Sequence, residues 1–245
     1  MNGPVWLQHA TTAVRLRTSI RRYAHRVLDA LGHPPVASDP GEREFVRTSA
    51  SGPAPLRVLV FGAGLAVGYG VTSRDDALDG ALVRLLTDRT RRGVVLENRA
   101  RQHLRLSDAV ESLGAVGTHT WEVAIWCPSF ADGLERLRLT SWRNELHAMI
   151  REIRAAEPTP ILLTHMAVPV GWHPAAVVAR PWVLRINRVI DQVAAEHDAV
   201  LAVAVEPFTP REVGQLTTGP GYFAAAAARV DEGLARLLPV AATRH

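Results

Sequence analysis

Four polar residues of the types that serve in acyl-transfer chemistry each come shortly after a short apolar run. They are His103, Ser129, Asp132 and His165. A histidine can act as a general base or a metal ligand, a serine hydroxyl can act as a nucleophile, and a carboxylate can orient the base. If the apolar runs are parallel strands, these side chains meet at one end of a sheet, and Trp172 on a nearby loop could form a wall of a ligand pocket.

A second interpretation gives His103 and His165 no catalytic role and makes them hydrogen-bonded residues of a crevice, and this is the one we favour. The ligand types also allow a metal site built from His103, Asp132 and His165, but no local spacing of ligands supports it. We therefore expect neither a metal ion nor another cofactor.

The glycine-rich segment 62–70 follows the apolar run 57–61 and raises the question of a dinucleotide site. Such a site needs a tight turn that leads straight into a helix whose N-terminus meets the pyrophosphate. Here the glycines continue to Gly70, and a helical pattern starts only near Arg74. The segment therefore predicts a long loop, and nucleotide binding is the weaker interpretation.

Short runs rich in apolar and β-branched residues alternate with amphipathic segments from residue 56 onward, which is typical of βα units and a parallel sheet. Helical periodicity appears between the runs and again near the end of the chain. We expect a three-layer α/β/α sandwich of flavodoxin-like type with a mostly parallel sheet of about five strands. Proteins with such sheets bind ligands at the carboxyl ends of the strands. The predicted strands are 57–61, 94–97, 122–126, 160–164 and 199–205.

The chain divides into three predicted regions. Residues 1–33 form a basic amphipathic helix, residues 34–55 a linker rich in Pro, Gly and Ser, and residues 56–245 the α/β domain. The arginines of the first helix could rest on an anionic membrane surface, but we favour packing of this helix on the domain or on a partner.

The composition excludes several classes of function. The chain has 245 residues, 47% of them hydrophobic, and its 28 basic residues are all arginine, with a formal net charge of +4. Nothing in it resembles a nucleic-acid-binding motif, and its one cysteine, Cys127, rules out an internal disulfide framework and fits a buried small side chain. No stretch reaches the roughly 18 apolar residues of a membrane span, and no secretory signal is visible. We expect a cytoplasmic protein.

The segment from Val58 to Gly70 resembles the first sequence block of the GDSL, or SGNH, hydrolases. The flanking residues match, but in that family an aspartate and the nucleophilic serine occupy the positions of Ala63 and Gly64. The resemblance implies the fold of these hydrolases over residues 56–240, and it implies an active site without its nucleophile.

The later blocks of the family can also be located, and they differ in the same way. His103 occupies the position of an oxyanion glycine, and Ala131 that of an oxyanion asparagine, next to a retained Asp132. Counting back from Gly221 and Tyr222, Val213 stands at the position of the orienting aspartate and Leu216 at that of the base histidine.

This pattern of replacements predicts a degenerate member of the family. Without nucleophile and base, a triad loses on the order of 10⁶-fold in turnover. We therefore expect a protein that lacks serine-esterase activity and binds a small molecule or a protein partner at the strand-end crevice. The alternative is an esterase or acyltransferase-like enzyme rebuilt around Ser129, Asp132, His103 and His165.

Overall fold

The structure is a computed structural model that describes ten ranges of the chain. For residues 44–47, 174–179 and 220 it describes the backbone only. The ranges are 44–47, 54–68, 71–101, 104, 106–109, 121–128, 139–155, 157–168, 174–205 and 220–238.

The centre of the molecule is a sheet of six strands among the described residues, in the order β1-β3-β2-β4-β5-β6. Strands β2 to β6 run parallel to one another, which confirms the five parallel strands predicted from the alternating pattern. Their order along the sheet is the flavodoxin-like one, in which the first parallel strand lies between the second and the third. The strands are β1 (Glu44–Arg47), β2 (Leu56–Gly62), β3 (Val94–Asn98), β4 (Val123–Cys127), β5 (Ile161–Thr164) and β6 (Val200–Val203).

Strand β1 lies inside the segment 34–55, which the sequence predicts as a linker. It pairs antiparallel with β3, with Phe45 opposite Leu96 and Val46 opposite Val95. The pairing joins backbone groups at the edge of the sheet. The predicted helix over 1–33 lies outside the described residues.

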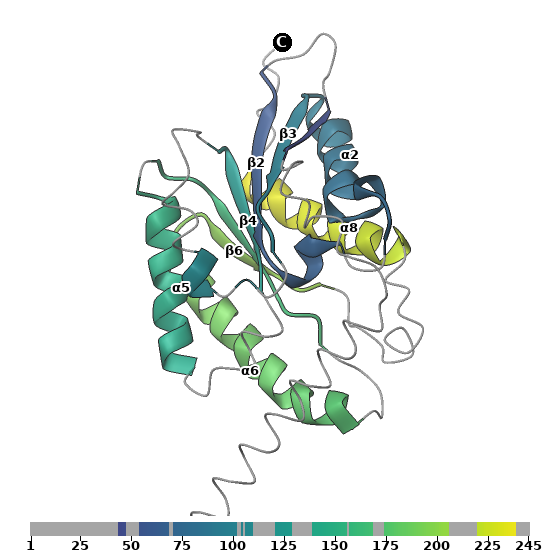
Figure 1. The fold of residues 1–245 in the computed structure, drawn as a ribbon. Coiled ribbons are helices and arrows are strands. Elements are labelled where there is room, and N and C mark those ends of the chain that lie inside the picture. The colour runs from purple at the N-terminus through teal and green to yellow at the C-terminus, as the bar shows by residue number, and fades with distance from the viewer. Residues whose placement is uncertain are drawn as a thin grey trace, which may run out of the picture.

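Two pairs of helices cover the two faces of the sheet, so the molecule has the three layers that the sequence predicts (Figure 1). Helices α2 (Leu78–Thr90) and α8 (Pro220–Leu237) lie together on one face, and α5 (Leu139–Ile153) and α6 (Pro174–Ala195) lie together on the other. Two short 3-10 helices, η2 (Gly64–Val67) and η3 (Arg74–Asp76), connect β2 to α2.

The core lies between these layers, where the central strands are buried on both faces. Leu59, Val60 and Ile125 are fully buried, and Trp126 of β4 packs against Trp142 of α5 with ring centroids 5.7 Å apart. Burial of both faces explains why the parallel strands read as continuous apolar runs and not as an alternation of polar and apolar residues.

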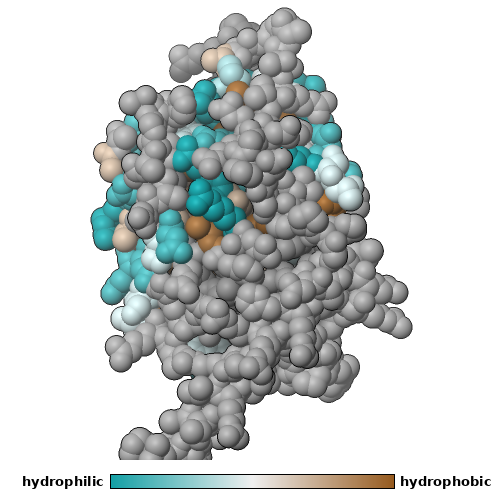
Figure 2. Space-filling view, in the orientation of Figure 1, coloured by the Kyte–Doolittle hydropathy of each residue, from teal (hydrophilic) through white to brown (hydrophobic). Residues whose placement is uncertain are grey.

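The surface over α5, at the left of the view, is mainly hydrophilic where its residues are described (Figure 2). The helices of the described ranges include none with the length and apolar character that a membrane span requires.

Candidate functional site

The turn after β2 lies where the order of the parallel strands reverses, because β2 pairs with β3 on one side and with β4 on the other. Ligands of open α/β sheets bind outside the carboxyl ends of the strands at such a point. The turn consists of Gly62, Ala63 and Gly64, which are the residues that the sequence aligns with the hydrolase nucleophile block.

Close contact with β4 fixes the backbone of this turn. The N–H of Ala63 donates to the carbonyl oxygen of Cys127 at 2.8 Å. Gly62 has φ = 107°, and a Cβ atom on it would lie 2.0 Å from the same oxygen. Only glycine fits here, because a side chain would collide with the neighbouring strand and the conformation disfavours L-residues.

Gly64 begins η2 and has φ = 53°. A Cβ atom on it would lie 2.8 Å from the carbonyl oxygen of Pro128, which is tighter than ordinary van der Waals contact. The position aligned with the nucleophile carries no side chain, and the backbone around it leaves little room for one. Ala63, aligned with the family's aspartate, is buried.

A buried ion pair lies under this turn. The guanidinium of Arg74 donates to Oδ2 of Asp79 from Nη2 at 2.8 Å and from Nε at 3.2 Å. The two residues are only 8% and 1% exposed. A charge at such a depth is costly unless it is paired and hydrogen-bonded, so this pair fixes η3 against the first turn of α2.

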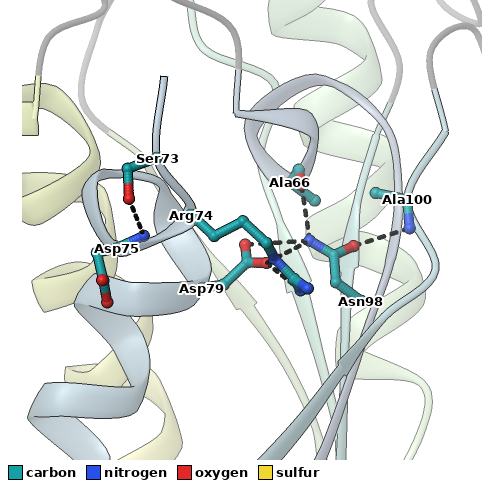
Figure 3. Close-up of polar contacts among 7 residues, drawn as sticks. All are labelled: Ala66, Ser73, Arg74, Asp75, Asp79, Asn98 and Ala100. Atoms are coloured by element: carbon teal, nitrogen blue, oxygen red, sulfur yellow. Dashed lines mark hydrogen bonds and ion pairs between the residues drawn. The ribbon is translucent and has the colours of Figure 1, made fainter. Parts of the chain in front are cut away.

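Asn98, at the end of β3, joins the ion pair to the turn, and Figure 3 shows Arg74, Asp79 and Asn98 pointing toward one another. Its Nδ2 donates to the carbonyl oxygen of Ala66 in η2 at 2.8 Å and lies 3.0 Å from Oδ1 of Asp79. Its Oδ1 accepts from the N–H of Ala100 at 2.8 Å. One buried amide therefore holds η2, α2 and the start of the loop after β3 together.

Local sequence explains how Arg74 reaches this position. The Oγ of Ser73 accepts a hydrogen bond from the N–H of Asp75 at 3.2 Å and caps η3. Gly80 lets η3 approach α2, since a Cβ atom there would lie 2.4 Å from the Cα of Asp75. The sequence patterns indicate no role for Arg74, Asp79 or Asn98, although a polar residue at the end of an apolar strand is a signal that points to Asn98.

Cys127 ends β4 beside this cluster and is fully buried, as the sequence predicts. Burial raises the pKa of its thiol to about 12, against a smaller opposing effect of Thr164. The thiol is therefore a packed side chain and is not an ionised nucleophile near neutral pH.

His165 follows β5 at the carboxyl end of the sheet, as predicted, but its ring turns away from Cys127. Thr164 lies beside Cys127, and side chains alternate between the faces of a strand, so the next residue faces the other side. There the Nε2 of His165 lies 2.8 Å from Oδ1 of Asp191 on α6. Asn187 of α6 fixes the following residue, because its amide exchanges two hydrogen bonds of 2.9 Å with the backbone of Met166.

The remaining predicted site residues cannot be placed relative to this turn, because they lie outside the described residues. This set includes four of the six crevice candidates, namely His103, Ser129, Asp132 and Trp172. It also includes four of the six positions aligned with family site residues, namely His103 again, Ala131, Val213 and Leu216. Within the described ranges, no three His, Cys, Asp or Glu side chains are grouped so that they could hold a metal ion.

Several solved structures share this fold, and some of them are named as esterases or lipases. The crystal structure of TesA superposes with a TM-score of 0.59 at 18% identity, over 74% of this chain and 99% of that one. AlinE4, an SGNH-hydrolase family esterase, gives 0.52 at 19% identity, over 62% of this chain and 77% of its own. The psychrotrophic esterase EstA from Pseudoalteromonas sp. gives 0.55 at 14% identity, over 75% and 98%. At identities this low, the superpositions establish a shared fold only.

A family model makes the assignment at the level of sequence. The model of the GDSL-like Lipase/Acylhydrolase family matches residues 60–230, which is most of the described domain and includes the turn after β2. No curated protein sequence matches the chain. The sequence match and the strand order agree, and the chain belongs to the GDSL-like lipase/acylhydrolase family.

Proposed function

We propose that this protein is a non-hydrolytic member of its family that binds a small molecule or a protein partner at the strand-end crevice. The observation that carries the proposal is Gly64. It occupies the position aligned with the nucleophile, in a left-handed conformation with the Pro128 carbonyl directly beside it.

The chemistry of the family explains why this residue matters. Ester cleavage through an acyl-enzyme needs an oxygen or sulfur nucleophile, a base that takes its proton and donors for the developing oxyanion. Gly64 supplies no nucleophile, and the buried thiol of Cys127 is protonated near neutral pH. The loss of such a nucleophile costs on the order of 10⁶-fold in turnover.

The scaffold around the turn supports binding as the retained activity. Arg74, Asp79 and Asn98 hold η2 and α2 in fixed positions through short hydrogen bonds. A crevice built on such preorganised backbone binds a ligand at a lower ordering cost than a flexible loop does. We also propose that the protein is cytoplasmic. Its single cysteine cannot form an internal disulfide, and internal disulfides are rare in cytosolic proteins and common in secreted ones.

Covalent labelling tests the proposal directly. The full chain is incubated with a fluorophosphonate probe, and the turnover of p-nitrophenyl butyrate is measured in parallel. We expect no stoichiometric adduct by intact mass and no turnover above that of the heat-denatured protein. Stoichiometric labelling at one side chain, together with turnover, would overturn the proposal.

The second candidate function is that of an esterase or acyltransferase-like enzyme with a rebuilt catalytic centre, because the ring of His165 contacts a carboxylate. A histidine held by an aspartate is the arrangement that orients a general base, and the 2.8 Å contact with Asp191 provides it. This candidate predicts p-nitrophenyl butyrate turnover that is lost in His165→Ala and in Ser129→Ala. Turnover that survives both substitutions contradicts it.

A further inference from the structure

A polar contact region joins α5 to the end of α6 and to the turn before β6, on the face of the sheet opposite α2. Arg143 of α5 contacts the carboxylate of Glu196 and lies 3.5 Å from Oε1 of Gln192. At its centre, Nδ1 of His147 lies 2.8 Å from Nε2 of His197. The two histidines are 50 residues apart in sequence, and both are only partly exposed.

The geometry of the two rings identifies this contact as a hydrogen bond. The ring centroids are 5.1 Å apart. At an N–N distance of 2.8 Å, two imidazoles reach such a separation only when the two nitrogens point nearly at each other. Two ligands of one metal ion instead point at a third position between them. The contact therefore holds a proton between the nitrogens.

The number of protons decides whether the contact exists. In the neutral pair, one ring donates its N–H and the other accepts. One additional proton is tolerated, since a single N–H still lies between the nitrogens and Oε2 of Glu196, 3.4 Å from Nε2 of His147, faces the positive charge. With a second additional proton, both facing nitrogens carry N–H groups, and the rings must separate.

The surrounding charges oppose full protonation. Arg143 and Arg151 on α5 and Arg154 just after it lie close to this region, against the carboxylate of Glu196 in the turn. The pKa of His197 is lowered, first by burial and then by its histidine partner and by Arg154. Glu196 acts in the other direction and is the smaller influence.

We propose that His147 and His197 form a pH-sensitive latch that holds α5 against the turn before β6 and opens when the pair takes up its second additional proton. This device goes beyond the proposed function and does not depend on it. The direction follows from linkage. Because His197 is harder to protonate in the folded protein than in the unfolded chain, its contribution to stability is present above about pH 6.5 and is lost as the pH falls below it.

Hydrogen exchange on the full chain tests the latch. Amide protection of α5 is measured relative to α2 at about pH 7.5 and about pH 5, with intrinsic exchange rates corrected for pH. In the wild type we expect the relative protection of α5 to fall by about fivefold or more. In His197→Gln the side-chain amide still donates to His147 but does not titrate, so we expect a change of less than about twofold.

Two further measurements keep the result unambiguous. His165→Gln removes another histidine that pairs with a carboxylate, and it should leave the pH response of α5 as in the wild type. Imidazole ¹⁵N titration of the wild type should show coupled proton uptake by the two rings. The proposal is overturned if wild-type α5 keeps its protection at low pH, if His197→Gln loses it equally, or if the two rings titrate independently.

Discussion

Asp79→Ala tests the idea that a buried ion pair organises the turn after β2. The substitution removes the carboxylate that accepts two hydrogen bonds from Arg74 and that contacts Asn98. Because Arg74 is 8% exposed, its charge stays in a poorly solvated site. Breaking a buried pair from one side costs about 3–5 kcal/mol. For a domain of this size that corresponds to a fall in Tm of about 6–20 °C.

The assay is urea unfolding followed by far-UV circular dichroism, with thermal unfolding in parallel. Asp75→Ala is the matched control, because Asp75 is next to Arg74 in η3 but its side chain is 71% exposed and lies 3.9 Å from Arg84. An exposed pair of this kind contributes at most about 1 kcal/mol. A double variant, Arg74→Met with Asp79→Leu, should be more stable than Asp79→Ala alone, since apolar side chains carry no desolvation cost.

The reasoning fails if Asp79→Ala and Asp75→Ala lower the free energy of unfolding by the same amount. It also fails if the double variant is less stable than Asp79→Ala, because the penalty would then not arise from a charge left without its carboxylate.

Three further predictions concern the same end of the sheet. Gly62→Ala should cost at least about 4 kcal/mol, because its Cβ would overlap the Cys127 carbonyl, and the yield of folded protein measures this. Gly64→Ser should cost about 1–2 kcal/mol from its left-handed conformation and give no turnover of p-nitrophenyl butyrate, since a nucleophile without a base is inactive; turnover above background would contradict this. Native Cys127 should not react with a disulfide reagent near pH 8 and should react fully in urea. Because its pKa rises from 9.0 to about 12 on folding, stability should fall as the pH increases above about 9, and a flat profile there would contradict the burial.

The sequence determined the parallel strands and their helices, and it predicts that the nucleophile of the family is replaced by Gly64. Whether a segment forms a strand or a helix follows from its hydrophobic periodicity, which can be read within a window of about 11–18 residues. The five predicted runs accordingly match β2 to β6 within a few residues at each end. The absence at Gly64 needed no structure, because a residue without a side chain lacks a nucleophile in any fold.

Other features were decided only by the tertiary structure, because they depend on contacts between residues far apart in the chain. Strand β1 pairs with β3, which lies far along the chain, and its four residues are too few to show a periodic pattern. Asn98 meets Asp79 across 19 residues, and His147 meets His197 across 50. Sequence patterns report the environment of a residue along one element, whereas these pairs depend on which elements pack together. The ring of His165 illustrates the difference: its place at a strand end follows from the sequence, and its partner Asp191 only from the packing of α6.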